Sequence, residues 1–81
     1  MKIVWDEPKR QQNLAKHCID FALLTVEFFE GSMVYPAKEG RFLAIGKLGG
    51  QIIVAVVFKP LGSEALSVIS MRPASKNERS L

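Results

Sequence analysis

The chain has little cysteine and little histidine, and both scarcities narrow the chemistry open to it. Among its 81 residues there is one cysteine, Cys18, and one histidine, His17. A single cysteine excludes a disulfide within the chain, and this pair does not supply the three protein ligands that a catalytic zinc usually takes. The eight carboxylates are dispersed, which disfavours a Mg²⁺ site. We therefore expect neither a metal nor a cofactor.

Long apolar runs are also missing. The longest covers residues 52–58, far short of the ~18 residues that cross a bilayer. The N-terminal stretch turns acidic at Asp6, before the apolar region of a signal peptide could form. There is no glycine-rich loop of the kind that cradles the phosphates of nucleotides. We expect a cytoplasmic protein that makes no contact with a membrane.

The composition is typical of one small folded domain, covering residues 1–81. Hydrophobic residues make up 48% of the chain and charged residues 23%, the balance of a globular rather than a disordered protein. A domain of this size has a thin core, so burial against a partner would add useful stability. The net charge of +3 permits nucleic-acid binding without requiring it.

Two helices are predicted in the first third of the chain. Asp6 before Pro8 is a typical helix start, and this helix is expected to run to His17. Its weakly apolar side, expected to face the core, holds Gln11, Leu14, Ala15 and Cys18. Its polar side holds Lys9, Asn13, Lys16 and His17. A second helix is expected over residues 20–29, capped by Asp20, and its core-facing stripe is Phe21, Leu24 and Phe28.

Strand patterns dominate the rest of the chain. Strands are expected over residues 3–5, 33–35, 41–48, 51–58 and 65–71. Gly49-Gly50 suits a tight hairpin turn, and Ser75 followed by Glu78 is a capping box that predicts a short terminal helix. The expected fold class is α+β, with two N-terminal helices packed on an antiparallel sheet of four to five strands and a short C-terminal helix.

Several short motifs together resemble the BrnT family of ribonuclease toxins. That family opens with a strand ending in Trp-Asp and a helix bearing Lys, Asn and Lys-His at set intervals, here Trp5, Asp6, Lys9, Asn13, Lys16 and His17. A Phe-rich second helix follows, then a strand from an Arg to a Gly, here residues 21–29 and Arg41 to Gly46. The family closes with Ile-Ser-x-Arg-x-Ala and an Arg-bearing tail, here residues 69–74 and Arg79. No single motif is specific, but the likeness covers essentially the whole chain.

The resemblance implies a RelE-like fold and a metal-independent endoribonuclease toxin. Its partner would be a BrnA-type antitoxin that binds DNA through a ribbon-helix-helix domain, so this chain would meet DNA only through that antitoxin. One position departs from the family, which usually has Gly where this chain has Cys18. A Cβ in a left-handed helix end costs roughly 1 kcal/mol. Either the first helix ends differently here or this residue is strained.

The same residues suit metal-free RNA cleavage, which needs a base, an acid and cations around the phosphate. Histidine ordinarily titrates near pH ~6.5, so His17 is the natural proton carrier. Arginine binds phosphate oxygens in pairs and stays charged. We predict as catalytic residues His17, Arg41, Arg72 and Arg79. We predict as RNA-binding residues Lys9, Lys16, Asn13 and Trp5.

Each of these residues also has a structural interpretation. A histidine near a helix C-terminus can simply interact with the helix dipole, and polar residues on a helix surface are by default solvated. Arg72 can pair with Glu78, Arg41 and Arg79 can be solvent-exposed, and Trp5, like Tyr35, can belong to the core. Cys18 is expected to be a small buried hydrophobe. The competing function is a non-catalytic nucleic-acid- or protein-binding module, including a degenerate toxin that only binds its antitoxin.

Overall fold

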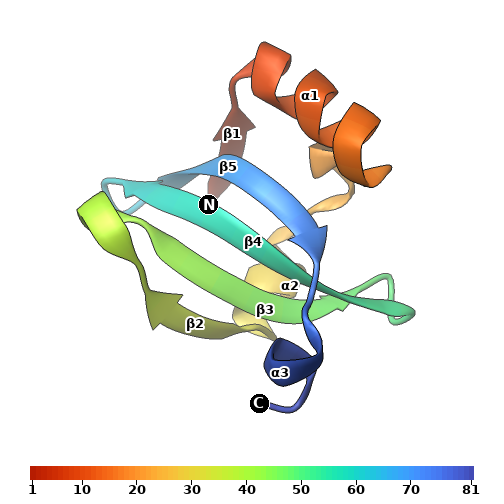
Figure 1. The fold of residues 1–81 in the computed structure, drawn as a ribbon. Coiled ribbons are helices and arrows are strands. Elements are labelled where there is room, and N and C mark those ends of the chain that lie inside the picture. The colour runs from red at the N-terminus through yellow and green to blue at the C-terminus, as the bar shows by residue number, and fades with distance from the viewer.

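The computed structural model describes the whole chain, residues 1–81. Its central feature is one five-stranded sheet (Figure 1). Its strands are β1 (Lys2–Trp5), β2 (Met33–Pro36), β3 (Phe42–Leu48), β4 (Ile52–Leu61) and β5 (Ala65–Pro73). The helices are α1 (Glu7–His17), α2 (Val26–Glu30) and α3 (Lys76–Arg79), with 3₁₀ turns η1 (Phe21–Leu23) and η2 (Lys38–Gly40). The α+β class and the short terminal helix are as predicted. No helix is long and apolar enough to span a bilayer.

The sheet is mixed rather than antiparallel. Its order is β1-β5-β4-β3-β2, and β2 to β5 form the predicted antiparallel meander. β1 instead pairs in parallel with β5, which corrects the expected topology. A parallel neighbour needs a long connection, and here α1 and the meander lie between the two strands along the chain. Gly49 and Gly50 have φ of 62° and 73° and form the predicted tight turn between β3 and β4.

The single helix expected over residues 20–29 is two separate pieces, so that prediction is wrong. Between η1 and α2 the chain is extended, with ψ of 138° at Leu24 and 165° at Thr25. The Thr25 hydroxyl accepts a hydrogen bond from the Phe28 amide at 3.1 Å and starts a new helix. Asp20 accepts from the Ala22 amide at 2.9 Å and therefore caps only the 3₁₀ turn.

The core lies between one face of the sheet and the η1–α2 segment. The predicted stripe is buried, with Phe21, Leu24 and Phe28 exposing 0%, 6% and 7% of their surface. Inward side chains from the strands complete the core, among them Ala44, Val54, Val56, Phe58, Leu66, Val68 and Met71. We call the opposite side of the sheet the open face. Alternation and pairing place on it Tyr35, Leu43, Val57, Ser70 and Arg72.

A β-bulge interrupts the alternation of β5. Val57 pairs with Ser70 and the next residue of β4 pairs with Val68, so Ile69 is an extra residue in β5. Val68 faces the core before the bulge, and Met71 faces it afterwards. A bulge re-aims the side chains that follow it. It is therefore the reason that Arg72 lies on the open face.

α1 turns its polar side toward the sheet, the reverse of the predicted orientation. Asn13 is 7% exposed, whereas Leu14 is 37% exposed and Cys18 is also exposed. β1 pairs with β5 only as far as Val68, so the edge of β5 beyond it lacks a neighbouring strand. The Asn13 side chain fills that gap by accepting a hydrogen bond from the Met71 amide at 3.0 Å. A covering helix with a suitable polar group thus satisfies the open edge.

Cys18 ends α1 in the left-handed conformation, with φ of 59° and ψ of 28°. Its amide donates to the carbonyl of Leu14 at 2.8 Å, which closes the last turn. The helix therefore ends where the sequence predicts, and the Cβ of Cys18 occupies a position that favours glycine. The expected burial of this thiol is wrong, because the buried side of α1 is the other one.

Candidate functional site

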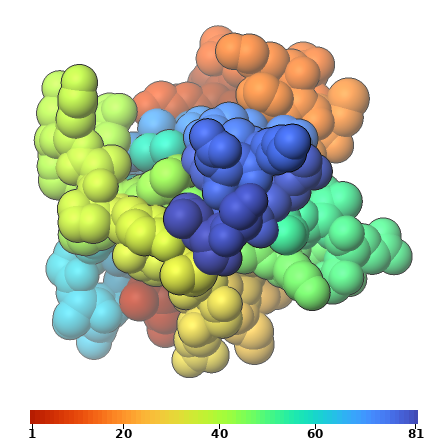
Figure 2. All heavy atoms as spheres, turned by 60° about the horizontal axis from the view of Figure 1, so that its bottom comes forward, coloured from red at the N-terminus to blue at the C-terminus, as the bar shows by residue number.

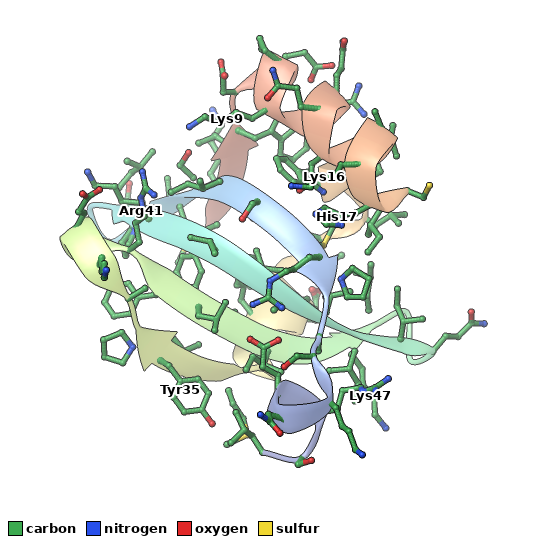
Figure 3. The ribbon with its side chains drawn as sticks, in the orientation of Figure 1. Lys9, Lys16, His17, Tyr35, Arg41 and Lys47 are labelled. Atoms are coloured by element: carbon green, nitrogen blue, oxygen red, sulfur yellow. The ribbon has the colours of Figure 1, made fainter.

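A shallow hollow of about 310 Å³ separates α1 from β5. We call it the α1 hollow; it is lined by Lys9, Gln12, Asn13, Lys16, His17, Ile69 and Ser70. The helical residues recur every three or four positions and so share one face of α1. Figure 3 shows Lys16 and His17 projecting from α1 toward β5. The structure thus brings together four of the eight residues predicted for the site.

The α1 hollow is positively charged. None of its seven lining residues is acidic, while Lys9 and Lys16 are both exposed and His17 is half-buried. Uncompensated cations in a concave surface attract anions such as phosphate. Nowhere in the chain do three His, Cys, Asp or Glu side chains converge in a way that could hold a metal ion.

Asn13 forms a wall of the hollow rather than a free ligand. Its Nδ2 donates to the carbonyl of Ile19 at 3.3 Å, and its Oδ1 accepts from the amide of Met71 at 3.0 Å. Both ends of the amide are therefore used by the fold. Its predicted role in RNA binding is not supported, and Asn13 instead fixes the distance between α1 and β5.

Arg72 lies on the open face, two residues beyond Ser70 along β5. Its Nη1 and Nη2 donate to the two carboxylate oxygens of Glu78 at 2.6 and 2.8 Å. These hydrogen bonds lower the pKa of Glu78 to about 2 and raise the pKa of Arg72. The ion pair weighed against catalysis for Arg72 is therefore present.

Arg41 and Arg79 lie outside the α1 hollow. Figure 3 places Arg41 at the end of the sheet near η2, away from His17, where it immediately precedes β3. Arg79 belongs to α3 and lines a different hollow of about 370 Å³, together with Met33 and Lys47. In Figure 2 the C-terminal segment stands forward of the sheet between β2 and the β3–β4 hairpin. The three arginines are therefore not gathered around one imidazole.

Trp5 packs toward the core. Its ring meets the ring of Phe21 edge-on, with 6.3 Å between centroids, and its Nε1 donates to Glu7 at 3.2 Å. The indole is thus held on both its apolar and its polar side, as aromatic residues of a core usually are. Its predicted stacking on RNA bases is not supported by this position.

Three residues that sequence analysis does not assign to the site, Ser70, Tyr35 and Lys47, lie on the open face of the sheet. Ser70 lines the α1 hollow, and only the bulge at Ile69 brings it there, so the one available signal was its place in the motif before Arg72. Tyr35 is half-buried and pairs with Leu43 on the open face. Figure 3 shows Tyr35 and Lys47 projecting from the lower part of the sheet.

Comparison with known proteins agrees with the motifs of the sequence. A family model for the ribonuclease toxin BrnT of type II toxin–antitoxin systems matches residues 5–78. The crystal structure of the Brucella abortus ribonuclease toxin BrnT is similar to this chain, with a TM-score of 0.89 and 64% sequence identity. The match covers 94% of this chain and 99% of that one. A search of curated proteins found no match. The predicted resemblance is confirmed: this chain belongs to the BrnT family of ribonuclease toxins, which act in type II toxin–antitoxin systems and so have RNA as substrate and an antitoxin as partner.

Proposed function

We propose that this toxin is a metal-independent endoribonuclease whose reaction site is the α1 hollow together with Arg72. One observation carries the proposal. The single imidazole of the chain lies in a hollow with two lysines and no carboxylate, and Arg72 lies two residues beyond Ser70, which lines that hollow, on the same face of β5. These groups supply a proton carrier and the cations that RNA cleavage by its own 2′-hydroxyl requires.

In this mechanism the ribose 2′-hydroxyl attacks the adjacent phosphate and the 5′-oxygen of the next nucleotide leaves. His17 takes the proton from the 2′-hydroxyl or gives one to the leaving 5′-oxygen, and a solvent water molecule carries out the other proton transfer. Lys9 and Lys16 hold the phosphate, and Arg72 stabilises the charge that builds up on its oxygens in the transition state. The products are a 2′,3′-cyclic phosphate, or the 3′-phosphate formed from it, and a 5′-hydroxyl.

Arg41 and Arg79 take a different role in this proposal from the one predicted. Each lies outside the α1 hollow, on a different part of the molecule. Arg41 is half-buried and Arg79 is exposed, and arginines that reach the surface at such positions bind the phosphates of flanking nucleotides. Tyr35 offers a half-buried aromatic ring on the same side of the sheet, on which an unpaired base can stack.

The antitoxin partner is, in this proposal, a BrnA-type protein with a ribbon-helix-helix domain, and the toxin meets DNA only through it. Family membership supports the partner class, and sequencing the reading frame next to the toxin gene tests the identity of the partner. Because the RNA substrate and the antitoxin are both cytoplasmic molecules, the toxin acts in the cytoplasm.

The test is cleavage of a defined RNA by purified toxin freed of its antitoxin, with EDTA present. We expect cyclic-phosphate or 3′-phosphate ends, and a loss of about 10²- to 10⁴-fold in kcat for His17→Gln. Gln11→Ala is the matched control, since Gln11 is exposed on the other side of α1. Ends bearing 3′-hydroxyls, full inhibition by EDTA, or an unchanged rate for the His17 variant would each refute the proposal. The competing binding module would retain RNA and leave it intact.

A further inference from the structure

The carboxylate of Glu78 is unusually constrained for a residue so near the chain end. It accepts hydrogen bonds from both terminal nitrogens of Arg72, and its Oε1 also accepts from the amide of Ser75 at 2.8 Å. The Glu78 amide in turn donates to the Ser75 hydroxyl at 3.1 Å, which completes the predicted capping box. The Glu78 side chain is 16% exposed. The Glu78 carboxylate is therefore held in one position, and it can fix the position of Arg72 in turn.

Glu78 holds one edge of the Arg72 guanidinium group, and Nη1 also donates to the carbonyl of Pro73 at 3.4 Å. A guanidinium has five N–H donors arranged as two forks, one between the terminal nitrogens and one between Nε and Nη2. Glu78 occupies the terminal fork, while the Nε–H of Arg72 has no partner within the protein. The Arg72 side chain is 43% exposed. The Nε edge is thus free to bind a second anion while Glu78 remains bound to the two terminal nitrogens of Arg72.

Arg10 shows what a purely structural arginine of this chain looks like. Its Nε and Nη2 donate to Glu7, and its Nη1 donates to both carboxylate oxygens of Asp20 at 3.0 Å. All three nitrogens are used, so no edge is left for a ligand. Arg72 differs because its pairing is half complete, and because the bulge turns it to the open face.

We infer that Glu78 is a positioning residue of the active site, which pins Arg72 so that its free Nε edge is held for the scissile phosphate. The inference rests on the proposed function. A guanidinium fixed before the substrate arrives needs no reordering as charge develops, so its contribution falls on kcat more than on KM. It also makes α3 a part of the reaction site, through a single side chain that holds another.

The experiment compares steady-state RNA cleavage by the wild-type toxin, Glu78→Gln, Ser75→Ala and Arg72→Ala. Glutamine keeps an oxygen for the Ser75 amide and for Nη1 of Arg72, but it presents an N–H group to Nη2 and lacks the negative charge, so the paired contact that holds Arg72 is lost. Ser75→Ala removes the cap hydroxyl and leaves the hydrogen bonds between Arg72 and Glu78 in place. It therefore controls for damage to α3. Glu78→Asp retains the charge on a shorter side chain. Circular dichroism and urea unfolding identify the pH and temperature at which all variants are folded.

We expect kcat to fall by about 10- to 100-fold in Glu78→Gln, with KM changed less than about threefold. Ser75→Ala should stay within about twofold of the wild type, and Glu78→Asp should lie between the two. In the Arg72→Ala background the Glu78→Gln change should have no further effect, because there is nothing left to position.

The inference is overturned if Glu78→Gln cleaves at the wild-type rate, if Ser75→Ala loses as much, or if the Glu78 and Arg72 effects multiply. These results leave the proposed function intact, since the wild type still cleaves. A folded wild-type toxin that yields no cyclic-phosphate or 3′-phosphate ends would instead refute the proposed function, and the inference with it.

Discussion

Asn13 and Met71 are joined by a hydrogen bond of 3.0 Å between a side-chain oxygen of α1 and a backbone amide of β5, across 58 residues of chain. The other end of the same amide donates to the carbonyl of Ile19. One buried side chain therefore ties a helix, the end of β5 that β1 does not cover, and the loop that follows the helix. His17 lies one turn further along α1, so this tie also sets where the imidazole stands relative to β5.

Replacing this amide should be costly. Asn13→Ala leaves the Met71 amide and the Ile19 carbonyl without partners in a buried place, and we expect a loss of about 2–4 kcal/mol in the free energy of unfolding. Urea unfolding followed by circular dichroism measures it. Gln11→Ala, on the exposed side of the same helix, is the control and should change stability by less than about 0.5 kcal/mol. A loss below about 1 kcal/mol for Asn13→Ala would show that the tie matters little.

The left-handed end of α1 predicts a stabilising substitution. Cys18 has φ of 59°, and glycine adopts this conformation without the steric cost of a Cβ. We expect Cys18→Gly to raise the free energy of unfolding by about 0.5–1 kcal/mol, a gain partly offset by the greater freedom of glycine in the unfolded chain. Cys18→Ala, which keeps the Cβ, should give no such gain. A gain in RNA cleavage by Cys18→Gly would in addition reveal that the cysteine impairs the site next to it.

The Arg72–Glu78 pair predicts a specific response to acid. The pKa of Glu78 is about 2 in the folded protein, against an ordinary value of 4.5. Its ionisation therefore favours folding at every pH above about 4.5, and this contribution is lost as the pH falls toward 2. After allowance for solvent around a pair at the surface, we expect about 1–2 kcal/mol.

Unfolding free energies of the wild type and Glu78→Gln, measured from pH 6 down to pH 2.5, check this expectation. The wild type should lose more stability over that interval, so that the two curves converge in acid. Parallel curves would show that the pair contributes no pH-dependent stability.

The cations of the α1 hollow predict the salt dependence of RNA binding. Lys16 lines the hollow and is exposed. If it neutralises one phosphate of a single strand, Lys16→Ala should reduce the slope of log K against log salt by about 0.7. Fluorescence anisotropy with an RNA that lacks the 2′-hydroxyl at the cleavage site measures binding without cleavage. Lys2→Ala, at the start of β1, is the charge-matched control, and an equal change in slope there would mean that only net charge matters.

Local patterns predicted much of the fold. The start and end of α1, the Gly49-Gly50 turn and the Ser75–Glu78 capping box are each set by a few adjacent residues, and the structure has all of them. The break in the second helix is also a local feature, because Thr25 can cap a helix as well as Asp20 can. The mixed sheet could not be predicted in this way, because the pairing of β1 with β5 depends on contacts across the whole chain.

The orientation of α1 shows why apolar periodicity misled. The helix was expected to bury its weakly apolar side, yet burial here follows a demand for hydrogen bonds at the uncovered edge of β5. That demand arises because β1 ends at Trp5 while β5 continues, and nothing in the sequence of α1 reveals it. The exposure of Leu14 and Cys18 is the consequence.

The site was predictable only where one helix supplied it. Lys9, Lys16 and His17 are brought together by helical spacing alone. Arg72 reaches the same side of the molecule through a bulge that no sequence pattern announced. Arg41 and Arg79 were grouped with His17 by chemistry, and the path of the chain carries them elsewhere.

The extra residue in β5 limits how this strand can change in length. Val68 and Met71 both face the core and lie three residues apart, whereas strict alternation would place inward-facing residues two or four apart. If β5 paired with β4 without the bulge, Met71 and Arg72 would exchange surroundings, which would place a guanidinium in the core and a thioether in solvent. Deleting Ile69 would instead restore strict alternation and leave Met71 in the core and Arg72 on the open face. We therefore expect relatives of this toxin either to keep the bulge with three steps at this point of the strand or to lose the bulge and the extra residue together.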